Sequence, residues 1–163
     1  MGTLPPKKKP DTGPARLADL FDGTKWGEDF TRQEVDIIAS HLGLTTFADG
    51  EYVFREGDRQ DFMAFIVSGQ VDIVKESQDA AEAFIITLPP RTHLGEMAFV
   101  DGEPRSASAR AKGDVTLLVL PKARFHAILA EHPAIGVKML MKIARLLSRR
   151  LRQTTGRLVC APL

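Results

Sequence analysis

Residues 95–111 read GEMAFVDGEPRSASARA, and this stretch differs from the segments on either side of it. Glu96 to Val100 is helical in character, although it lies between strand-like segments that a plain turn would join. A helix start next to glycine leaves backbone N–H groups without intrahelical partners, and such groups attract anions. Arg105 adds a planar guanidinium that can hold two phosphate oxygens, and Pro104 stiffens the chain before it. The stretch therefore predicts a site for a small phosphate.

Glu96 needs a partner other than the phosphate, because a carboxylate is repelled by a phosphate unless it faces a donor such as a sugar hydroxyl. The hydroxyl of Ser106 and the backbone N–H groups of Ser106 and Ala107 add donors next to Arg105. A carboxylate, a guanidinium and these donors within one loop indicate a ribose phosphate as ligand. The alternative is that Glu96 and Arg105 pair with each other on a surface loop, which contributes little to stability.

The segments around this stretch, from Leu44 to Pro121, show an apolar period of two. They are rich in Val, Ile, Phe and Thr, and turn-forming pairs divide them into about seven short strands. Gaps of hairpin length leave no room for parallel crossovers, so the pattern predicts an antiparallel sandwich or barrel. The expected turn pairs are Asp49-Gly50, Gly57-Asp58, Ser68-Gly69, Pro89-Pro90, Asp101-Gly102 and Gly113-Asp114.

The sequence predicts two helices before the strands and two after them. The first covers residues 15–21. The second begins at a capping box formed by Thr31 and Glu34, and Gly43 closes it. Of the last two helices, one ends before Pro133, because the residue before a proline avoids the helical region, and the other begins at Pro133.

The last helix, which we expect to end near Thr155, carries two apolar rows. One row suits packing against the strands, and the other has the 3,4,3,4 spacing of a coiled-coil seam, which predicts a homodimer. The alternative is that both rows form one wide core-facing stripe of a monomer. The first row consists of Ile135, Met139, Ile143 and Leu146, and the second of Val137, Leu140, Ala144, Leu147 and Leu151.

The composition fits one globular domain. The chain has 163 residues, of which 44% are hydrophobic and 26% charged, which excludes a largely disordered, collagen-like or disulfide-scaffold protein. The 22 Lys and Arg residues against 21 Asp and Glu residues give a formal charge of +1, so the overall charge gives no reason to expect nucleic acid or a membrane as partner. No stretch approaches the ~18 apolar residues of a membrane span, and the single Cys160 cannot form an internal disulfide. We therefore expect a cytoplasmic protein.

The sequence also argues against an enzyme and against a metal site. It holds no Ser/His/Asp or Cys/His arrangement, no zinc-ligand spacing and no Gly-rich loop with lysine. The histidines are scattered, and we expect them to be structural or solvated. They are His41, His93, His126 and His132.

The combination of Gly-Glu-Met-Ala at 95–98 and Pro-Arg-Ser-Ala-Ser at 104–108 resembles the phosphate-binding cassette of the cyclic nucleotide-binding domain. Bacterial catabolite activator proteins, regulatory subunits of cyclic-nucleotide-dependent kinases and cyclic-nucleotide-gated channels share this domain. The resemblance covers roughly Phe30 to Thr155. It implies an α+β fold: an antiparallel β-roll, or double-stranded jelly roll, with N-terminal helices, a short cassette helix and two C-terminal helices.

The resemblance also implies which residues bind the ligand. Glu96 is the expected partner of the ribose 2′-hydroxyl and Arg105 that of the cyclic phosphate. Backbone N–H groups assist, namely those of Gly95, Met97, Ala98, Ser106 and Ala107. Val71 and Ile73 are candidates for the apolar wall under the sugar and base, although core packing explains them equally well. Thr154 and Thr155 correspond to hydroxyl residues that read the purine edge in the bacterial activators, unless they form only a polar helix end.

Ser106 does not decide between adenine and guanine as the base of the ligand. A hydroxyl directly after the arginine can bond the amino group of guanine, and cGMP-selective relatives often have Thr there, but bacterial cAMP binders carry Ser. We favour cAMP over cGMP as the ligand, and we expect no other cofactor.

These features predict a sensor module that binds a cyclic nucleotide and signals to a separate effector protein by repositioning its last helix. The bacterial activators have a helix-turn-helix domain after that helix, whereas about eight residues follow Thr155 here, so we do not expect nucleic acid as partner. The alternative is a transcription regulator, or a fragment of one, that uses the basic last helix. The basic residues of that helix, which otherwise form the solvated face of a dimer helix, are Lys138, Lys142, Arg145, Arg149, Arg150, Arg152 and Arg157.

The predicted boundaries follow from these patterns. Residues 1–14 hold four prolines and three lysines and form a disordered tail. The other expected divisions are N-terminal helices over 15–43, the β-roll over 44–121, C-terminal helices over 122–155 and a tail over 156–163.

Overall fold

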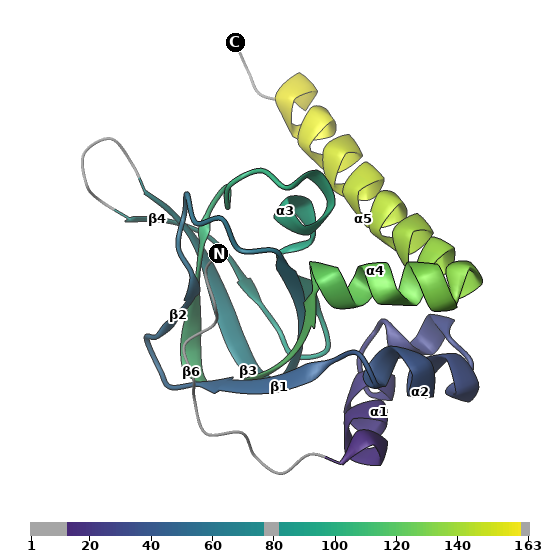
Figure 1. Cartoon of the computed structure of the whole chain (residues 1–163). Coiled ribbons are helices and arrows are strands. Elements are labelled where there is room, and N and C mark those ends of the chain that lie inside the picture. The colour runs from purple at the N-terminus through teal and green to yellow at the C-terminus, as the bar shows by residue number, and fades with distance from the viewer. Residues whose placement is uncertain (1–12, 77–81, 161–163) are drawn as a thin grey trace. The chain divides into compact units, whose positions relative to one another are not determined.

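The structure is a computed structural model that describes residues 13–76 and 82–160. It divides into two compact units, Met1–Phe125 and His126–Leu163. Residues 1–12 of the first predicted tail and residues 161–163 of the second lie outside the described residues. In chain order the elements are α1 (Pro14–Asp22), η1 (Gly27–Asp29), α2 (Arg32–Ala39), β1 (Gly43–Phe47), β2 (Tyr52–Phe54), β3 (Phe62–Glu76), β4 (Glu82–Leu88), β5 (His93–Leu94), α3 (Glu96–Asp101), β6 (Ser108–Pro121), α4 (Lys122–Glu131) and α5 (Pro133–Cys160) (Figure 1).

Helices α1 and α2 lie side by side at the start of the first unit (Figure 1). α1 begins with Pro14 at its first position, where the missing N–H has no intrahelical partner to lose. Its buried face consists of Leu17, Ala18 and Phe21. The predicted helix over residues 15–21 is confirmed, with one further residue at each end.

The capping box predicted for α2 is present. Thr31 Oγ1 accepts a hydrogen bond from the Glu34 N–H, and the Thr31 N–H donates to Glu34 Oε2. The helix ends at Ala39, so the predicted end at Gly43 is wrong. The N–H groups of residues 41 and 42 donate to carbonyls three positions back, and this tighter turn ends the α-helix before β1 begins.

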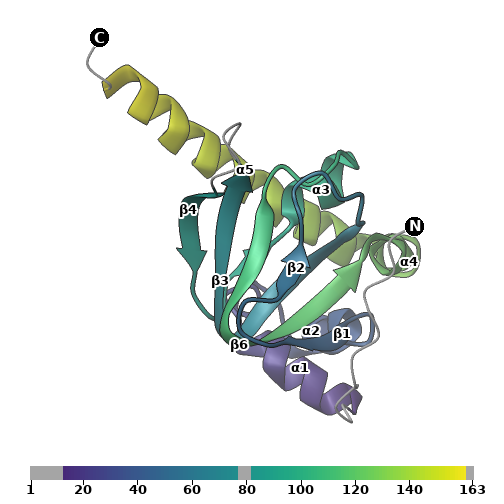
Figure 2. The ribbon, with the colours of Figure 1, turned by 90° about the vertical axis from the view of Figure 1, so that its left-hand side faces the viewer.

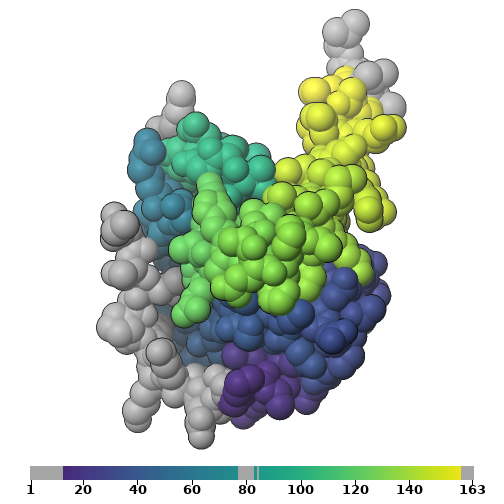
Figure 3. All heavy atoms as spheres, turned by 45° about the vertical axis from the view of Figure 1, so that its right-hand side comes forward, coloured from purple at the N-terminus to yellow at the C-terminus, as the bar shows by residue number. Residues whose placement is uncertain are grey.

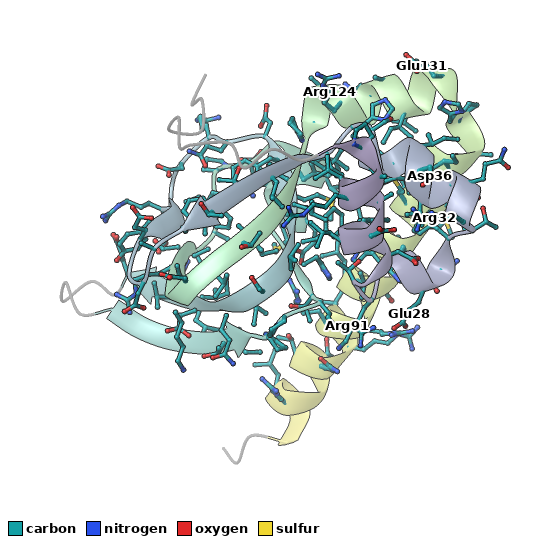
Figure 4. The ribbon with its side chains drawn as sticks, turned by 90° about the horizontal axis from the view of Figure 1, so that it is seen from below. Glu28, Arg32, Asp36, Arg91, Arg124 and Glu131 are labelled. Carbon is teal, nitrogen blue, oxygen red and sulfur yellow. The ribbon has the colours of Figure 1, made fainter. Side chains whose placement is uncertain are left out.

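Arg91 ties the N-terminal helices to the turn between β4 and β5. Its Nε donates to Gly23 O at 2.8 Å and its Nη2 to Glu28 Oε1 at 2.7 Å (Figure 4). The backbone of Arg91 has a φ of 74°, which is uncommon for a residue with a side chain. Its carbonyl accepts from Lys25 N–H and its own N–H donates to Ile66 O. The helical layer is thus attached to the sheet through both backbone and side chain.

The strands form one antiparallel sheet in the order β1-β6-β3-β4, with β2 also paired to β6 and β5 to β3 (Figure 2). β3 and β6 are the longest strands, and their pairing runs from Phe62 opposite Pro121 to Val74 opposite Ser108. The apolar side chains on the inner faces, including Phe54, form a buried core. The predicted α+β fold with an antiparallel β-roll is confirmed.

Two predicted turns are wrong, because the chain continues as a strand through both of them. Ser68-Gly69 lies inside β3, and Gly113-Asp114 lies inside β6. Gly69 has a φ of 80° at the point where the β3–β6 register shifts, as in a β-bulge. A Cβ at Gly69 would collide with the carbonyl oxygen of Asp114, so this glycine allows the two strands to approach closely. A bulge and a turn both favour glycine, and the sequence pattern does not separate them.

The second unit is dominated by α5, which begins at Pro133 as predicted (Figure 3). Gly136 lies against Leu129, and a Cβ at this position would collide with the leucine side chain. α5 continues to Cys160, so the predicted end near Thr155 is wrong, and residues 156–160 are helical instead of part of a tail. A glycine inside a helix costs only about 1 kcal/mol relative to alanine, so Gly156 does not end the helix.

The two apolar rows of α5 differ in burial. Ile135, Met139 and Ile143 are buried, whereas Val137 is 54% exposed and Leu151 is 67% exposed. Leu140 is 37% exposed in the second row as well. Across the described helices, none is long and apolar enough to cross a membrane.

Candidate functional site

The short helix α3 and the loop after it form the cassette segment, residues 95–108. Gly95 precedes α3 with a φ of 82°, and Gly102 follows it with a φ of 72°. No side chain caps the N-terminus of α3. Ala98 is buried on the inner side of the helix, whereas Met97 is 44% exposed. The glycines therefore let a short helical piece leave and rejoin the sheet abruptly.

Arg105 is the central side chain of this segment and is only 3% exposed. Its Nη1 donates to Gly95 O at 3.0 Å and its Nη2 to Phe62 O at 2.7 Å. The guanidinium carbon lies 4.0 Å from the ring centre of Phe54 and 4.7 Å from that of Phe62, so two aromatic faces enclose the cation. Within the described part of the chain, the Nε–H of Arg105 has no hydrogen-bond partner. The Nε–H of Arg105 is thus a buried donor without an acceptor in that part of the chain.

Burial lowers the pKa of Arg105 to about 10, and the nearby carboxylates of Asp61, Asp58 and Glu96 act in the opposite direction. The guanidinium still carries its charge at neutral pH. The buried surroundings of Arg105 stabilise its charged form less than water does. The attraction between this guanidinium and a bound anion is therefore screened less by water than it would be at the surface.

The backbone of Arg105 is held by the turn between β2 and β3. The Gly57 N–H donates to Arg105 O at 2.8 Å, and the Arg105 N–H donates to Asp58 O at 2.9 Å. The turn closes on itself, since Arg55 N–H donates to Asp58 Oδ2. The predicted turn Gly57-Asp58 is therefore present, and it fixes the position of the arginine.

Glu96 is the first residue of α3 and is 3% exposed. Its Oε2 lies 3.7 Å from His93 Nε2. Both Glu96 and Arg105 are buried, which excludes the alternative of a pair on a solvent-exposed loop. A buried carboxylate and a buried guanidinium therefore belong to the same short segment.

The remaining predicted residues occupy different environments. Ser106 is exposed and Ala107 is half-buried. Val71 is completely buried in the core of the roll, so packing accounts for it, whereas Ile73 is only partly buried against that core. The hydroxyls of Thr154 and Thr155 donate to carbonyls of their own helix, Arg150 O and Leu151 O. Both threonines belong to the second unit, whereas the cassette segment belongs to the first.

Sequence reasoning missed the two rings that enclose Arg105. Phe54 and Phe62 lie on strands whose alternation predicts only inward-facing side chains, which is the usual place for phenylalanine. Within the described residues, no group of three His, Cys, Asp or Glu side chains is arranged to hold a metal ion.

Comparison with known proteins adds an independent line of evidence. A family model described as a cyclic nucleotide-binding domain matches residues 44–132, more than half of the chain. The crystal structure of a cyclic nucleotide-binding domain from Methylobacillus flagellatus has a TM-score of 0.77 at 27% identity and covers 92% of this chain and 84% of that one.

Two curated relatives are regulators. A CRP-like cAMP-activated global transcriptional regulator of Mycobacterium tuberculosis is 31% identical over 121 residues, 74% of this chain and 52% of that protein. A cAMP-dependent protein kinase regulatory subunit of Blastocladiella emersonii is 32% identical over 92 residues, 56% of this chain and 23% of that protein. The chain thus spans about half the length of the bacterial regulator. The family model, the fold and the buried arginine and glutamate agree, and the chain belongs to the cyclic nucleotide-binding domain family.

Proposed function

We propose that this chain is a cytoplasmic sensor module that binds a cyclic nucleotide, cAMP in preference to cGMP, and signals by repositioning its C-terminal helix. The observation that carries the proposal is the buried guanidinium of Arg105 with an open Nε–H. A buried donor without an acceptor costs about 1–3 kcal/mol, and the phosphate of a ligand supplies the missing acceptor. Relatives described as cAMP-activated and cAMP-dependent support the choice of cAMP.

Each residue of the cassette segment has a proposed role. Arg105 binds the cyclic phosphate through the guanidinium N–H groups that do not donate to Gly95 O or Phe62 O. Glu96 accepts a hydrogen bond from the ribose 2′-hydroxyl. The backbone N–H groups proposed to complete the phosphate site are those of Gly95, Met97, Ala98, Ser106 and Ala107. Ile73 is the better candidate than Val71 for the apolar wall, because it is less buried. Thr154 and Thr155 remain proposed contacts of the base.

Isothermal titration with cAMP and with cGMP tests the function. We expect saturable binding of both, with cAMP tighter. The open-chain nucleotide 5′-AMP is the control, and weaker binding of 5′-AMP is expected because the site is proposed to fit a cyclic phosphate. Absence of binding by either cyclic nucleotide at high micromolar concentration contradicts the proposal, and tighter binding of cGMP reverses the preference.

Replacing Glu96 with glutamine is expected to weaken cAMP binding about tenfold, because a neutral acceptor makes a weaker hydrogen bond to the ribose than a carboxylate does. The substitution keeps the shape of the side chain. Titration of 2′-deoxy-cAMP into both proteins is the control, and the two proteins are expected to bind it equally. A tenfold difference that persists with 2′-deoxy-cAMP contradicts the role given to Glu96.

We propose a homodimer through the exposed apolar row of α5, whose members are Val137, Leu140, Ala144, Leu147 and Leu151. Leu151→Glu is expected to shift the protein from dimer to monomer in sedimentation velocity, because a carboxylate in a coiled-coil seam is buried without a partner. Arg152→Glu places the same side chain one position away, outside the seam, and is expected to leave the dimer intact. A wild-type protein that sediments as a monomer contradicts the proposal.

A separate effector protein remains the proposed recipient of the signal. The basic face of α5 supports a second candidate function, binding of DNA by a transcription regulator of which this chain forms part. The mycobacterial relative is described as a transcriptional regulator. Fluorescence anisotropy with duplex DNA at low salt tests it, and an absence of saturable binding by this chain excludes α5 as a sufficient DNA-binding element.

A further inference from the structure

The pairing of β3 with β6 stops at the residue where the cassette segment ends. The last paired residues of β3 and β6 are Val74 and Ser108. Residues 105–107 precede β6, so they receive no ladder hydrogen bonds from β3. The turn at Gly57-Asp58 holds Arg105, which leaves the peptide unit between Ser106 and Ala107 to be supported by other contacts.

Lys75, the residue after the last β3 position paired with β6, provides this contact. Lys75 Nζ donates to the carbonyl oxygen of Ser106 at 2.7 Å and to Glu56 Oε1 at 3.0 Å. The second oxygen of Glu56, Oε2, accepts from the backbone N–H of Glu76 at 3.0 Å. The side chains of Lys75 and Glu56 therefore form a bridge from the end of β3 to the cassette segment, hereafter the Lys75–Glu56 bridge.

The backbone of Glu56 makes a second contact with the cassette segment, at Ser108. Its N–H donates to Oγ of Ser108 at 2.8 Å, and Ser108 is buried. The N–H of Glu76 and then the ammonium of Lys75 lower the pKa of Glu56, so the carboxylate stays ionised at neutral pH. The bridge thus joins three segments that are far apart in sequence: the β2–β3 turn, the end of β3 and the cassette.

The geometry of the peptide bond converts this contact into a constraint on the proposed ligand site. A trans peptide is planar, and its C=O and N–H point in opposite directions. When Lys75 holds the carbonyl of Ser106, the N–H of Ala107 must point to the opposite side of the chain. Within residues 13–76 and 82–160, neither the Ser106 N–H nor the Ala107 N–H donates a hydrogen bond. These donors are therefore available to a phosphate.

We propose that Lys75 and Glu56 are positioning residues, which hold the peptide between Ser106 and Ala107 in the orientation that binds the phosphate of the ligand. This inference rests on the proposed function. Lys75 is 52% exposed, and an exposed ion pair contributes little to stability. The bridge differs from such a pair because its ammonium also bonds a carbonyl of the cassette segment. Its effect is expected in ligand affinity more than in folding.

The test compares cAMP titrations of Lys75→Met and the wild type. Lys75→Met is expected to weaken cAMP binding about tenfold, because the peptide must be ordered when the ligand binds. Lys75→Arg retains a cationic donor and is expected to restore most of the affinity. Lys112→Met removes another exposed lysine, on β6, and is the matched control with unchanged affinity. Lys75→Met that binds cAMP like Lys112→Met overturns the inference.

A charge-exchanged variant separates the bridge from a simple ion pair. Glu56→Lys combined with Lys75→Glu restores opposite charges, but the new glutamate cannot donate to Ser106 O, and the new lysine cannot accept from the Glu76 N–H. We expect this double variant to bind cAMP as weakly as Lys75→Met. Recovery of the wild-type affinity in the double variant overturns the inference, because charge pairing alone would then suffice.

The NMR signal of the Ala107 amide in the ligand-free protein distinguishes failure of this inference from failure of the proposed function. Lys75→Met is expected to alter the chemical shift and lower the order parameter of this amide, while amides in the middle of β3 keep their order parameters. If the wild type binds no cyclic nucleotide, the proposed function fails and the ligand role of the bridge fails with it. If the wild type binds but the Ala107 amide is unaffected by Lys75→Met, only the positioning role fails.

Discussion

Replacing Arg105 with lysine is expected to weaken cyclic nucleotide binding about a hundredfold, although the formal charge of the side chain is kept. The guanidinium already donates through Nη1 and Nη2 to Gly95 O and Phe62 O, and its remaining N–H groups are the ones proposed to bind the phosphate. A lysine ammonium is a single point donor and cannot satisfy both carbonyls and a phosphate in that arrangement. Loss of two charge-assisted hydrogen bonds amounts to about 3 kcal/mol, which corresponds to the hundredfold change.

Burial adds to the effect of this substitution. The burial that lowers the pKa of Arg105 to about 10 also disfavours the charged form of a lysine placed there. The rings of Phe54 and Phe62 also lose the flat cation that lies between them.

Titration calorimetry of Arg105→Lys with cAMP measures the effect. Arg110→Lys on β6 is the control, since it makes the same chemical change at a half-buried position outside the cassette segment, and it is expected to leave the dissociation constant unchanged. Thermal unfolding of both variants without ligand shows whether the fold is retained. Equal affinity of Arg105→Lys and the wild type contradicts the role of Arg105.

Local signals in the sequence correctly predicted the elements that depend on neighbouring residues. The capping box of Thr31 and Glu34 is made by residues three positions apart, and Pro133 begins α5 where a proline is tolerated. The path through Gly69 depends instead on a contact with a distant strand. At Gly69 the deciding contact is the carbonyl of Asp114, which no spacing rule connects with residue 69.

The candidate site shows the same division. Glu96 and Arg105 are visible in the sequence because their chemistry is unusual within one loop. The groups that hold Arg105 are backbone carbonyls of Gly95 and Phe62, and every residue has a carbonyl, so side-chain identity gives no sign of them. The contact of Lys75 with Ser106 O is hidden for the same reason. The sequence therefore suffices to predict the candidate binding residues, whereas the backbone contacts that hold them are visible only in the fold.

Gly95→Ala is expected to lower cyclic nucleotide affinity at least as much as Arg105→Lys, although it adds only one methyl group. Gly95 has a φ of 82°, and a Cβ built on its backbone lies 2.7 Å from Arg105 Nη1 and 3.1 Å from Phe62 O. The contact with Nη1 is too short for a methyl group, and the contact with the carbonyl is tighter than ordinary van der Waals contact. That carbonyl belongs to the backbone of β3, which has little freedom to move. The guanidinium must therefore shift, and its hydrogen bonds to Gly95 O and Phe62 O break or lengthen.

The left-handed backbone conformation at Gly95 has its own cost for alanine, about 1–2 kcal/mol of the free energy of unfolding. Gly102→Ala separates this cost from the collision with Arg105. Gly102 has a φ of 72° at the other end of α3, but a Cβ built there would lie 3.8 Å from Lys122 Nζ, which is an ordinary contact. Chemical denaturation and cAMP titration of both variants are compared with the wild type. We expect both variants to lose similar stability and only Gly95→Ala to lose affinity, and an equal loss of affinity in the two would mean that backbone strain around α3, and not displacement of the guanidinium, controls the site.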